Sequence, residues 1–307
     1  MSLEKNEEGF VLKDFSFYIL YKIVKMLFII MPNQVAKGFL NFLTYLIQKF
    51  DGKHKLVPME NLDFVFGDGL SLERKKEIIS NSYKNLTYNL YEFIINSSLS
   101  KEQLSKKITI IGEEYILEAI KQNRSIIFIT AHYGNWELLS RYFAKYKPIS
   151  VVGRPLNNQY LNKELKEKRT LDDCNILDRD GATRGLMKAL KFKHNIGLVV
   201  DQHTSSSKGG IEVELFGKKA LQTDVPARLA MKFDTVLLPA FAVLKEFGKY
   251  EIIVYPPIPM DSSSSVESLT QAQADAIEKQ IRALPDQWMW QHRRFKEEYP
   301  HIYKGKR

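Results

Sequence analysis

Residues 125–139, SIIFITAHYGNWELL, constrain the fold more than any other stretch of the chain. An apolar, β-branched run ends at Thr130, the polar His132 follows, and after Gly134 the apolar residues return at helical spacing. This order predicts a buried strand, a tight turn and the start of a helix. The carboxyl end of a parallel strand is where open α/β sheets place their chemistry, so the turn is the first candidate site.

Strand and helix patterns alternate through the middle of the chain. Apolar runs separated by helical patterns predict βαβ units and parallel pairing. From Ile211 onward the strand patterns IEVELF, VLLPAFAV and YEIIVYPPI follow with short links, so this half of the sheet is expected to be mixed. The predicted fold class is therefore α/β, with a mixed, largely parallel central sheet flanked by helices. The earlier runs are residues 108–111, 149–153, 175–177 and 196–200.

The amino-terminal segment is unusually apolar. Residues 15–31 read FSFYILYKIVKMLFIIM, interrupted only by Lys22 and Lys25. Lysines three positions apart share one helical face, which favours a helix lying in the lipid headgroup region with its lysines reaching lipid phosphates. A pair of core helices and a short, tilted membrane span are the two alternatives. We expect membrane-associating helices in residues 1–56 and the main domain in residues 57–307.

The charge of the chain indicates an anionic partner. A net charge of +9 and a pI near 9.3 suit nucleic acid, a membrane surface or a phosphorylated substrate. The single cysteine, Cys174, excludes an internal disulfide. Because Cys174 stands alone and the histidines are scattered, no zinc-type ligand spacing exists and no metal is expected.

His132 and Glu137 are the first catalytic candidates. A histidine can take a proton from a hydroxyl, and a carboxylate on its other ring nitrogen fixes the tautomer. Five positions are too far apart around one helix, but the pair can meet if His132 lies in the turn and Glu137 in the first helical turn. The chain lacks G-x-S-x-G, which favours direct attack by an acceptor hydroxyl over a covalent intermediate. The alternative is a structural polar turn.

Further polar residues follow other strands and fall at the same predicted edge. Arg154 comes after the strand at 149–153 and Arg169 lies on the next helix, and arginine forks suit phosphate or carboxylate groups. Asp201 and Gln202 follow the strand at 196–200. His203 is a weaker candidate base, because we predict no carboxylate in a comparable turn beside it.

Two more features leave alternatives open. Residues 288–296, WMWQHRRFK, mix aromatic and basic side chains, as in a base-stacking strip or an interfacial belt at a lipid surface. His292 within this segment is expected to be structural. The backbone N–H groups of residues 132–135, at a helix start, are hypothesised to bind an oxyanion.

Taken in order, these motifs resemble the late acyltransferases of lipid A biosynthesis in Gram-negative bacteria, the lauroyl/myristoyl transferase group of the H-x4-D/E acyltransferase superfamily. The resemblance includes the amino-terminal segment and covers nearly the whole chain. One departure is Leu215-Phe216, where the family has paired phenylalanines. The motifs are Asn61-Leu-x-x-x-Phe66, AHYGNWE at 131–137, Arg154-Pro-x-Asn157, Arg169, Asp201-Gln202, Phe216-Gly217, Thr223-Asp-Val-Pro-Ala227 and Pro285-x-x-Trp288-x-Trp290-x-His292-x-Arg294.

The resemblance implies a reaction and its setting. A fatty acyl chain would pass from acyl carrier protein to the hydroxyl of a 3-hydroxyacyl chain on a Kdo-bearing lipid A precursor. The implied place is the cytoplasmic face of the inner membrane, with anionic lipid as a further partner. Acyl carrier protein serves as co-substrate, and neither a cofactor, a metal nor nucleic acid is expected. The implied fold is like that of the glycerolipid acyltransferases.

The resemblance also implies roles for individual residues. His132 would be the general base and Glu137 the carboxylate that orients it. The expected substrate-binding residues are Arg154, Arg169, Asp201, Gln202 and Asn135. Two alternatives stay open: an acyltransferase of the same superfamily acting on another glycolipid or a lysophospholipid, and a non-catalytic basic protein that binds membranes or nucleic acid.

Overall fold

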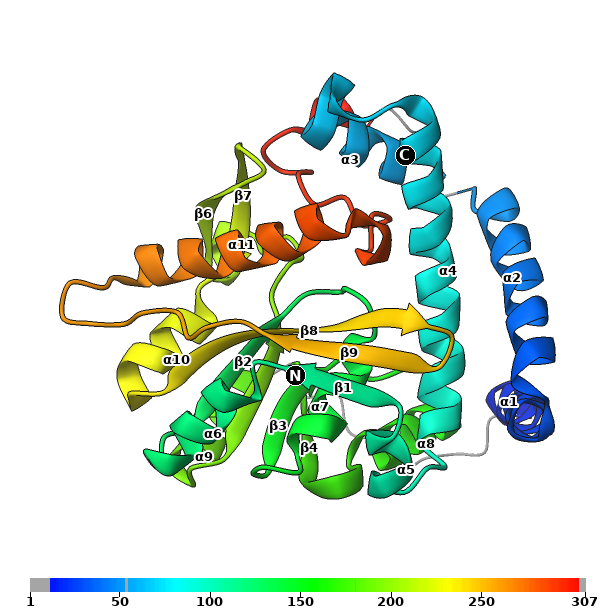
Figure 1. The fold of residues 1–307 in the computed structure, drawn as a ribbon, viewed down its shortest axis with the longest axis horizontal. Helices are drawn as coiled ribbons and strands as arrows, with labels where there is room; N and C mark the ends of the chain where they lie inside the picture. The colour runs from blue at the N-terminus through cyan, green and yellow to red at the C-terminus, as the bar shows by residue number, and fades with distance from the viewer. Residues whose placement is uncertain (1–11, 53–54, 180, 304–307) are drawn as a thin grey trace, which may run out of the picture.

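A seven-stranded sheet forms the centre of the computed structural model, which describes residues 12–52, 55–179 and 181–303 (Figure 1). Every neighbouring pair in it is parallel except β8 and β9, so the predicted mixed, largely parallel sheet is confirmed. In spatial order the strands are β1 (Ile108–Ile111), β9 (Lys249–Val254), β8 (Val236–Glu246), β2 (Ile126–Thr130), β5 (Asn195–Val199), β3 (Ile149–Gly153) and β4 (Cys174–Asp178).

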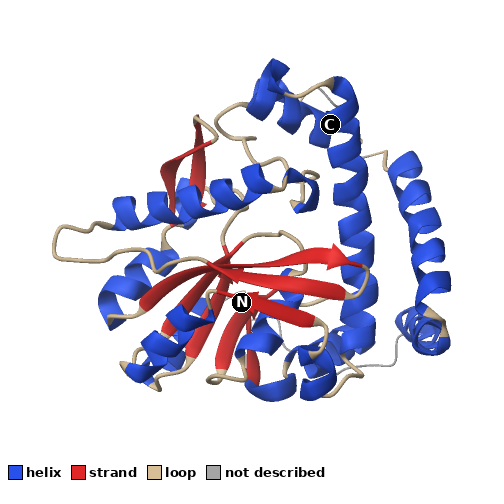
Figure 2. Cartoon of the chain, viewed as in Figure 1, coloured by secondary structure: helices blue, strands red, loops and turns tan. Residues whose placement is uncertain are grey.

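Two further strands form a separate hairpin, which Figure 2 shows apart from the central sheet. β6 (Gly210–Leu215) and β7 (Lys218–Thr223) pair antiparallel across a two-residue turn. In that turn Phe216 has φ 57° and Gly217 has φ 71°, the backbone that tight hairpins favour. The assignment of residues 211–216 to the main sheet was wrong, and β7 was not predicted because KKALQT carries too few apolar residues to be read as a strand.

Helices cover both faces of the sheet because side chains of a strand alternate between faces. On β2, Ile126 and Phe128 pack in one hydrophobic core with α6 and α7, whereas Ile127 and Ile129 pack in the other with α9, α10 and α11. The turn after β2 therefore extends from a strand buried on both faces. The helices are α6 (Glu113–Lys121), α7 (Trp136–Phe143), α9 (Ala182–Lys191), α10 (Val225–Phe233) and α11 (Val266–Ala283).

The amino-terminal helices lie outside the sheet, against α4, which separates α2 from the strands (Figure 1). Ser71 caps α4 by accepting a hydrogen bond from the Arg74 N–H. Phe28, Leu40 and Tyr91 form a small core between α1, α2 and α4. The remaining helices are α1 (Leu12–Ile30), α2 (Asn33–Phe50), α3 (Val57–Phe66), α4 (Leu72–Asn96), α5 (Lys101–Ser105) and α8 (Gln159–Arg169), with 3-10 turns at Gly67–Gly69, Leu171–Asp173, Ser206–Lys208, Pro285–Gln287 and Pro300–Ile302.

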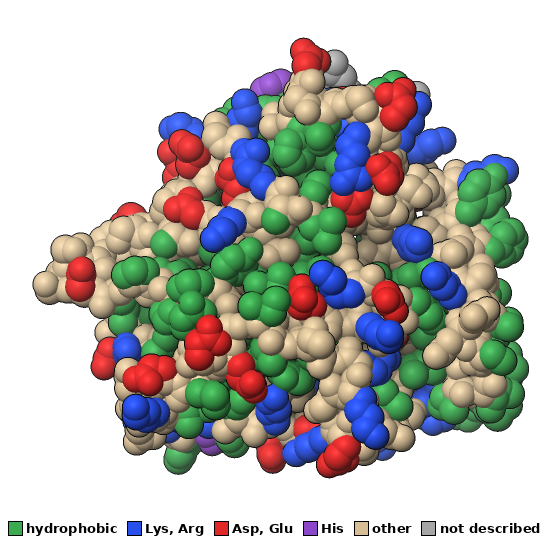
Figure 3. All heavy atoms as spheres, in the orientation of Figure 1, with side chains coloured by type: hydrophobic (Ala, Val, Ile, Leu, Met, Phe, Trp, Pro, Cys, Tyr) green, Lys and Arg blue, Asp and Glu red, His purple; other side chains and the backbone are tan. Residues whose placement is uncertain are grey.

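Helices α1 and α2 expose many large apolar side chains. Figure 3 shows hydrophobic side chains along the edge of the molecule that α2 forms. Among the residues described, no helix combines the length and the apolarity that a membrane span requires. The division at residues 56 and 57 stays a prediction. The exposed set includes Leu12, Phe17, Leu20, Ile23, Met26, Leu27, Ile29, Ile30, Val35, Phe39, Phe42, Tyr45 and Phe50.

The two lysines of α1 form ion pairs with a carboxylate on α8. Lys25 Nζ is 3.1 Å from Glu164 Oε1 on α8, and Lys22 Nζ is 3.5 Å from Oε2. The sequence did not indicate these contacts with the largely buried carboxylate of Glu164. The side chain of Lys22 is still 45% exposed, and the expected contact with lipid phosphates stays a prediction. These ion pairs fasten α1 to the helix that carries Arg169.

Candidate active site

His132 and Asp201 lie side by side at the carboxyl ends of neighbouring parallel strands. The register pairs Thr130 of β2 with Val199 of β5, so the residues two positions further along each chain are also neighbours. Nδ1 of His132 is 2.8 Å from Oδ1 of Asp201. Asp201 is buried, with 3% of its surface exposed, whereas 23% of the His132 side chain remains accessible. The prediction that the sheet edge brings these two residues together is confirmed.

Glu137 makes a different contact from the one predicted. Nε of Arg169 donates to Oε2 of Glu137 at 3.0 Å, and a second guanidinium nitrogen donates to Oε1. The sequence placed Glu137 on the second ring nitrogen of His132, but the structure places Asp201 there. This contact prediction is wrong because the first turn of α7 directs Glu137 toward α8. Arg169 therefore belongs to the site through Glu137.

The charges around His132 determine which ring nitrogen can act as a base. Burial lowers the pKa of His132, but the charge and hydrogen bond of Asp201, and then the charge of Glu137, outweigh it and raise the pKa above the ordinary value. Burial raises the pKa of Asp201, yet the charge of His132 and the hydrogen bonds from His132 and Trp288 lower it overall. Asp201 therefore stays ionised and Nδ1 keeps its proton, which leaves Nε2 as the accepting nitrogen. The Nε2 atom of Gln202 lies 3.5 Å from it.

The turn between β2 and α7 can only be made by glycine at position 134. Gly134 has φ 52°, and a Cβ there would lie 1.8 Å from the Ala242 carbonyl oxygen. Its N–H donates to the Gln287 carbonyl at 3.0 Å, and the Asn135 N–H donates to Ala242 at 2.8 Å. The Tyr133 N–H also has a partner within the protein, the Ala131 carbonyl. The His132 N–H in turn makes a backbone hydrogen bond to Asp201. All four N–H groups of residues 132–135 thus have partners within the protein, which contradicts the hypothesis that they bind an oxyanion.

Two asparagines on α4 hold the same turn from the other side. Asn85 Nδ2 donates to the Gly134 carbonyl at 3.0 Å, and Asn89 donates to the same oxygen. Their spacing of four places them on one face of the helix, and both are buried. Sequence reasoning missed them, although the polar stripe that they form with Ser82 and Glu92 on one face of the helix was a usable signal. Asn135, predicted to bind substrate, is 1% exposed and lies with them in the support of the turn.

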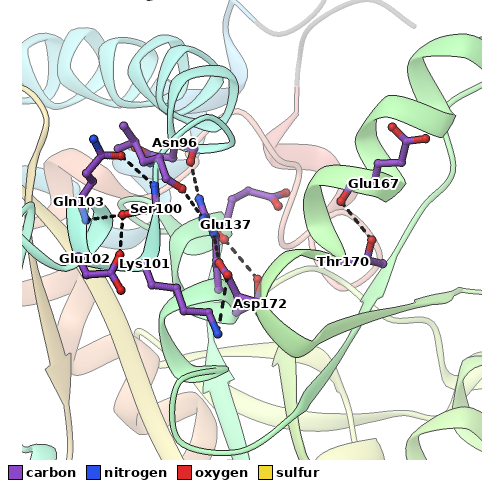
Figure 4. A network of polar contacts seen from close by, with 12 residues as sticks. Asn96, Ser100, Lys101, Glu102, Gln103, Glu137, Glu167, Thr170 and Asp172 are labelled. Atoms are coloured by element: carbon purple, nitrogen blue, oxygen red, sulfur yellow. Dashed lines mark hydrogen bonds and ion pairs between the residues drawn. The ribbon is translucent and has the colours of Figure 1, made fainter.

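The two predicted site arginines, Arg154 and Arg169, differ in their burial and in their contacts. Arg154 is exposed on the loop after β3, at the predicted edge, whereas Arg169 is part-buried against Glu137. Figure 4 shows Asn96, Glu137 and Asp172 close together. Arg141 of α7 donates to Asp172 and to the Asn96 carbonyl. A cavity of about 40 Å³ lies here and has room for roughly a few water molecules, not for an acyl chain. It is lined by residues that include Asn135, Glu137, Arg141, Lys168 and Arg169.

The carboxyl-terminal segment supplies a contact that the sequence did not reveal. Nε1 of Trp288 donates to Oδ2 of Asp201 at 2.7 Å, and the Met289 N–H donates to the His132 carbonyl at 3.0 Å. Trp288 is 2% and Trp290 0% exposed. Both earlier interpretations, a base-stacking strip and an interfacial belt, are therefore wrong for these tryptophans. The resemblance pointed to Trp288 as part of a motif, but nothing in it indicated Asp201 as the partner.

Two further histidines, His203 and His292, lie near the site, and the His203 N–H donates to His292 Nε2 at 3.4 Å. His203 Nε2 lies 2.7 Å from Glu297 Oε2, a carboxylate that comes from the carboxyl-terminal segment and not from a turn beside His203. Burial lowers the pKa of His292 to about 4, which keeps this ring neutral. Asn61 of α3 donates to the carbonyls of Trp290 and His292 at 2.8 and 2.9 Å and so anchors the segment. In the described part of the chain, no three His, Cys, Asp or Glu side chains gather as metal ligands would.

Comparison with known proteins identifies what the chain resembles. A sequence model described as "Bacterial lipid A biosynthesis acyltransferase" matches residues 5–297. The chain is 27% identical over 250 residues to the lipid A biosynthesis lauroyltransferase of Escherichia coli K12, covering 81% of each chain. It is 24% identical over 189 residues to the phosphatidylinositol mannoside acyltransferase of Mycolicibacterium smegmatis, covering 61% of this chain and 62% of that one. The solved 1-acyl-sn-glycerophosphate acyltransferase PlsC of Thermotoga maritima aligns with a TM-score of 0.39 and 15% identity, covering 81% of this chain and 97% of the other.

Proposed function

The chain belongs to the bacterial lipid A biosynthesis acyltransferases, and we propose that it moves a fatty acyl chain from acyl carrier protein to the hydroxyl of a 3-hydroxyacyl chain on a Kdo-bearing lipid A precursor. The observation that carries the proposal is the His132–Asp201 pair at the sheet edge, which leaves Nε2 as the ring nitrogen that can take a proton. The same relatives support the reaction class, because they are acyltransferases of lipid A or of another glycolipid.

The proposed step is direct transfer. Nε2 of His132 takes the proton of the acceptor hydroxyl while its oxygen attacks the thioester carbonyl carbon. The new C–O bond forms, the C–S bond breaks, and the imidazolium returns the proton to the leaving thiolate, which yields an ester and a free thiol. Asp201 stabilises the imidazolium between the two proton transfers, as the carboxylate of a catalytic triad does. Glu137 adds a second negative charge at longer range.

We propose that a side-chain amide, that of Gln202, stabilises the oxyanion in place of the backbone N–H groups. The amide of Gln202 lies beside His132 Nε2, at 3.5 Å, where the reacting oxygen must come. An N–H donor at that position can stabilise the negative charge that develops on the carbonyl oxygen. Gln202 therefore has a proposed role in transfer, whereas Arg154, exposed at the same edge, is proposed to bind an anionic group of the lipid or the carrier protein.

The proposed place of action is the cytoplasmic face of the inner membrane. The apolar surface of α1 and α2 supports this proposal, because contiguous exposed apolar side chains mark sites of membrane or protein contact. The net charge of +9 favours anionic lipid headgroups and an acidic carrier protein. Since Glu164 holds α1 against α8, the helices that meet the lipid are tied to the helix that presents Arg169.

Removing apolar side chains from this surface should weaken membrane binding. Leu20 on α1 is 56% exposed and Phe42 on α2 is 58% exposed, so changing both to Gln should leave packing intact. Each such side chain contributes roughly 1.5–3 kcal/mol when fully buried in an apolar phase, so the partition coefficient should fall by at least about tenfold. Sedimentation with phosphatidylethanolamine/phosphatidylglycerol vesicles measures it. Leu117→Gln, at 52% exposed on α6, is the matched control and should bind as the unchanged protein does.

Lipid analysis tests the proposed substrate. Lipid A from a strain that lacks the protein should be short of one secondary acyl chain, and expression of the protein should restore it. Mass spectrometry of the extracts reads both. The similarity to a phosphatidylinositol mannoside acyltransferase favours another glycolipid acceptor as the second candidate. Unchanged lipid A together with loss of an acyl chain from another glycolipid would establish that second candidate instead.

A further inference from the structure

Asp201 is held at both of its carboxylate oxygens. Oδ1 lies 2.8 Å from His132 Nδ1, and Oδ2 accepts the Trp288 indole N–H at 2.7 Å. The carboxylate is 2% exposed, so solvent cannot replace either hydrogen bond. A carboxylate fixed at one oxygen can still turn about its Cβ–Cγ bond, whereas one fixed at two opposite sides cannot turn without breaking a charge-assisted hydrogen bond.

The backbone places the Trp288 ring in a fixed relation to His132. The segment that carries Trp288 runs along the catalytic turn: the Met289 N–H donates to the His132 carbonyl at 3.0 Å, and the Gly134 N–H donates to the Gln287 carbonyl at 3.0 Å. The Ser82 hydroxyl of α4 donates to the Trp288 carbonyl at 2.5 Å. The base and the indole are therefore positioned by one shared piece of backbone pairing.

We propose that Trp288 is a positioning residue for acyl transfer, which holds the Asp201 carboxylate in the plane where Oδ1 meets Nδ1 of His132. The inference rests on the proposed function and extends the His132–Asp201 pair to three residues, drawn from β2, β5 and the carboxyl-terminal segment. Trp288 does not touch the substrate. It acts only through Asp201, so its loss should change the proton affinity of His132 and not the binding of either substrate.

Trp290 provides a matched control two residues further on. Its indole N–H donates to the Pro285 carbonyl at 2.8 Å, and its ring centroid lies 4.6 Å from that of Trp288. Both indoles are buried in the same cluster and both donate one hydrogen bond to an oxygen. Replacing either with Phe removes one indole N–H and similar volume from the same core, but only Trp288→Phe removes a donor from Asp201.

The test compares the two variants in the full-length protein, first by NMR titration of His132 without substrate. Trp288→Phe should lower the pKa of His132 by about one unit, because a misaligned Asp201 no longer offsets burial, whereas Trp290→Phe should leave it within about 0.3 units. In acyl-transfer assays, Trp288→Phe should lower kcat about tenfold with KM within about twofold, and the acidic limb of its pH profile should move to lower pH. An unchanged or higher His132 pKa in Trp288→Phe, or equal shifts in both variants, would overturn the proposal.

The readouts separate this inference from the proposed function. The titration needs no substrate, so a His132 shift confined to Trp288→Phe supports the positioning role even if lipid A is not the acceptor. If Trp288→Phe does not fold, the unchanged protein still decides the matter. The NMR signal of the Trp288 indole proton is assigned by elimination from Trp136→Phe and Trp290→Phe. Its chemical shift should then change with pH at the midpoint of the His132 titration. A Trp288 indole chemical shift that does not change at that midpoint would contradict the inference.

Discussion

Changing Asp201 to Asn should lower kcat by about 10³- to 10⁴-fold while the protein stays folded. An amide facing Nδ1 can donate a hydrogen bond to it, which moves the ring proton to Nε2 and removes the accepting lone pair from the substrate side. The amide also lacks the charge that stabilises the imidazolium. Steady-state acyl transfer measures the loss, and circular dichroism with thermal unfolding shows whether the fold is retained.

Asp201→Asn should also change the pH dependence of acyl transfer. His132 must be neutral to accept a proton, and its raised pKa places the acidic limb of kcat/KM above the ordinary histidine value of about 6.5 in the unchanged protein. Activity is therefore lost as the pH falls through that raised pKa. Without the Asp201 charge, burial lowers the pKa, so the limb of Asp201→Asn should move to lower pH.

Glu137→Gln is the control for Asp201→Asn, because it removes an equal charge without a contact to His132. Its effect should pass through Arg169, so Glu137→Gln, Arg169→Gln and the double variant should lose similar amounts of activity, as expected for partners in one ion pair. Equal damage from Glu137→Gln and Asp201→Asn, with the acidic limb moved as far by each, would mean that Glu137 orients the base after all.

His132→Asn should remove acyl transfer, with a loss of about 10²- to 10⁴-fold for the missing general base. We choose Asn over Ala because an alanine would leave Oδ1 of the buried Asp201 carboxylate without its His132 partner, and breaking a buried charged pair costs about 3–5 kcal/mol. The Asn amide can still donate to Asp201, so the melting temperature should change little. Transfer assays and thermal unfolding report the two effects separately. Near-normal transfer in a folded His132→Asn protein would show that the turn is structural and that the chemistry lies elsewhere.

Local patterns predicted the elements that the site stands on. The strands at 108–111 and 149–153 and the strand that ends at Thr130 lie where the apolar runs placed them. The shared sheet edge for His132 and Asp201 also followed, because the carboxyl ends of parallel strands meet at one edge. These predictions depend only on residues close together in the sequence and on the right-handed crossover connection between parallel strands.

The partner of His132 could not be read in the same way. Glu137 is five residues from the histidine and Asp201 is sixty-nine, and only the pairing of Thr130 with Val199 decides which carboxylate reaches Nδ1. That register results from packing on both faces of β2 and β5, not from a local signal. The hydrogen bond from Trp288 to Asp201 is likewise a tertiary contact that no local pattern reveals. From the sequence alone, a tryptophan in a basic segment is easily taken for a surface residue.

The pairing of residues 287–289 with the catalytic turn also sets an order of events during synthesis. Synthesis proceeds from the amino terminus, so the residues of α1 and α2 leave the ribosome long before Gln287, whose carbonyl pairs with Gly134, is made. Until those last residues have emerged, Asp201 lacks its indole partner and the turn lacks one of its two flanking backbone strands. Under the proposed membrane contact, such a nascent chain could meet lipid through α1 and α2 before residues 287–289 complete the site for acyl transfer.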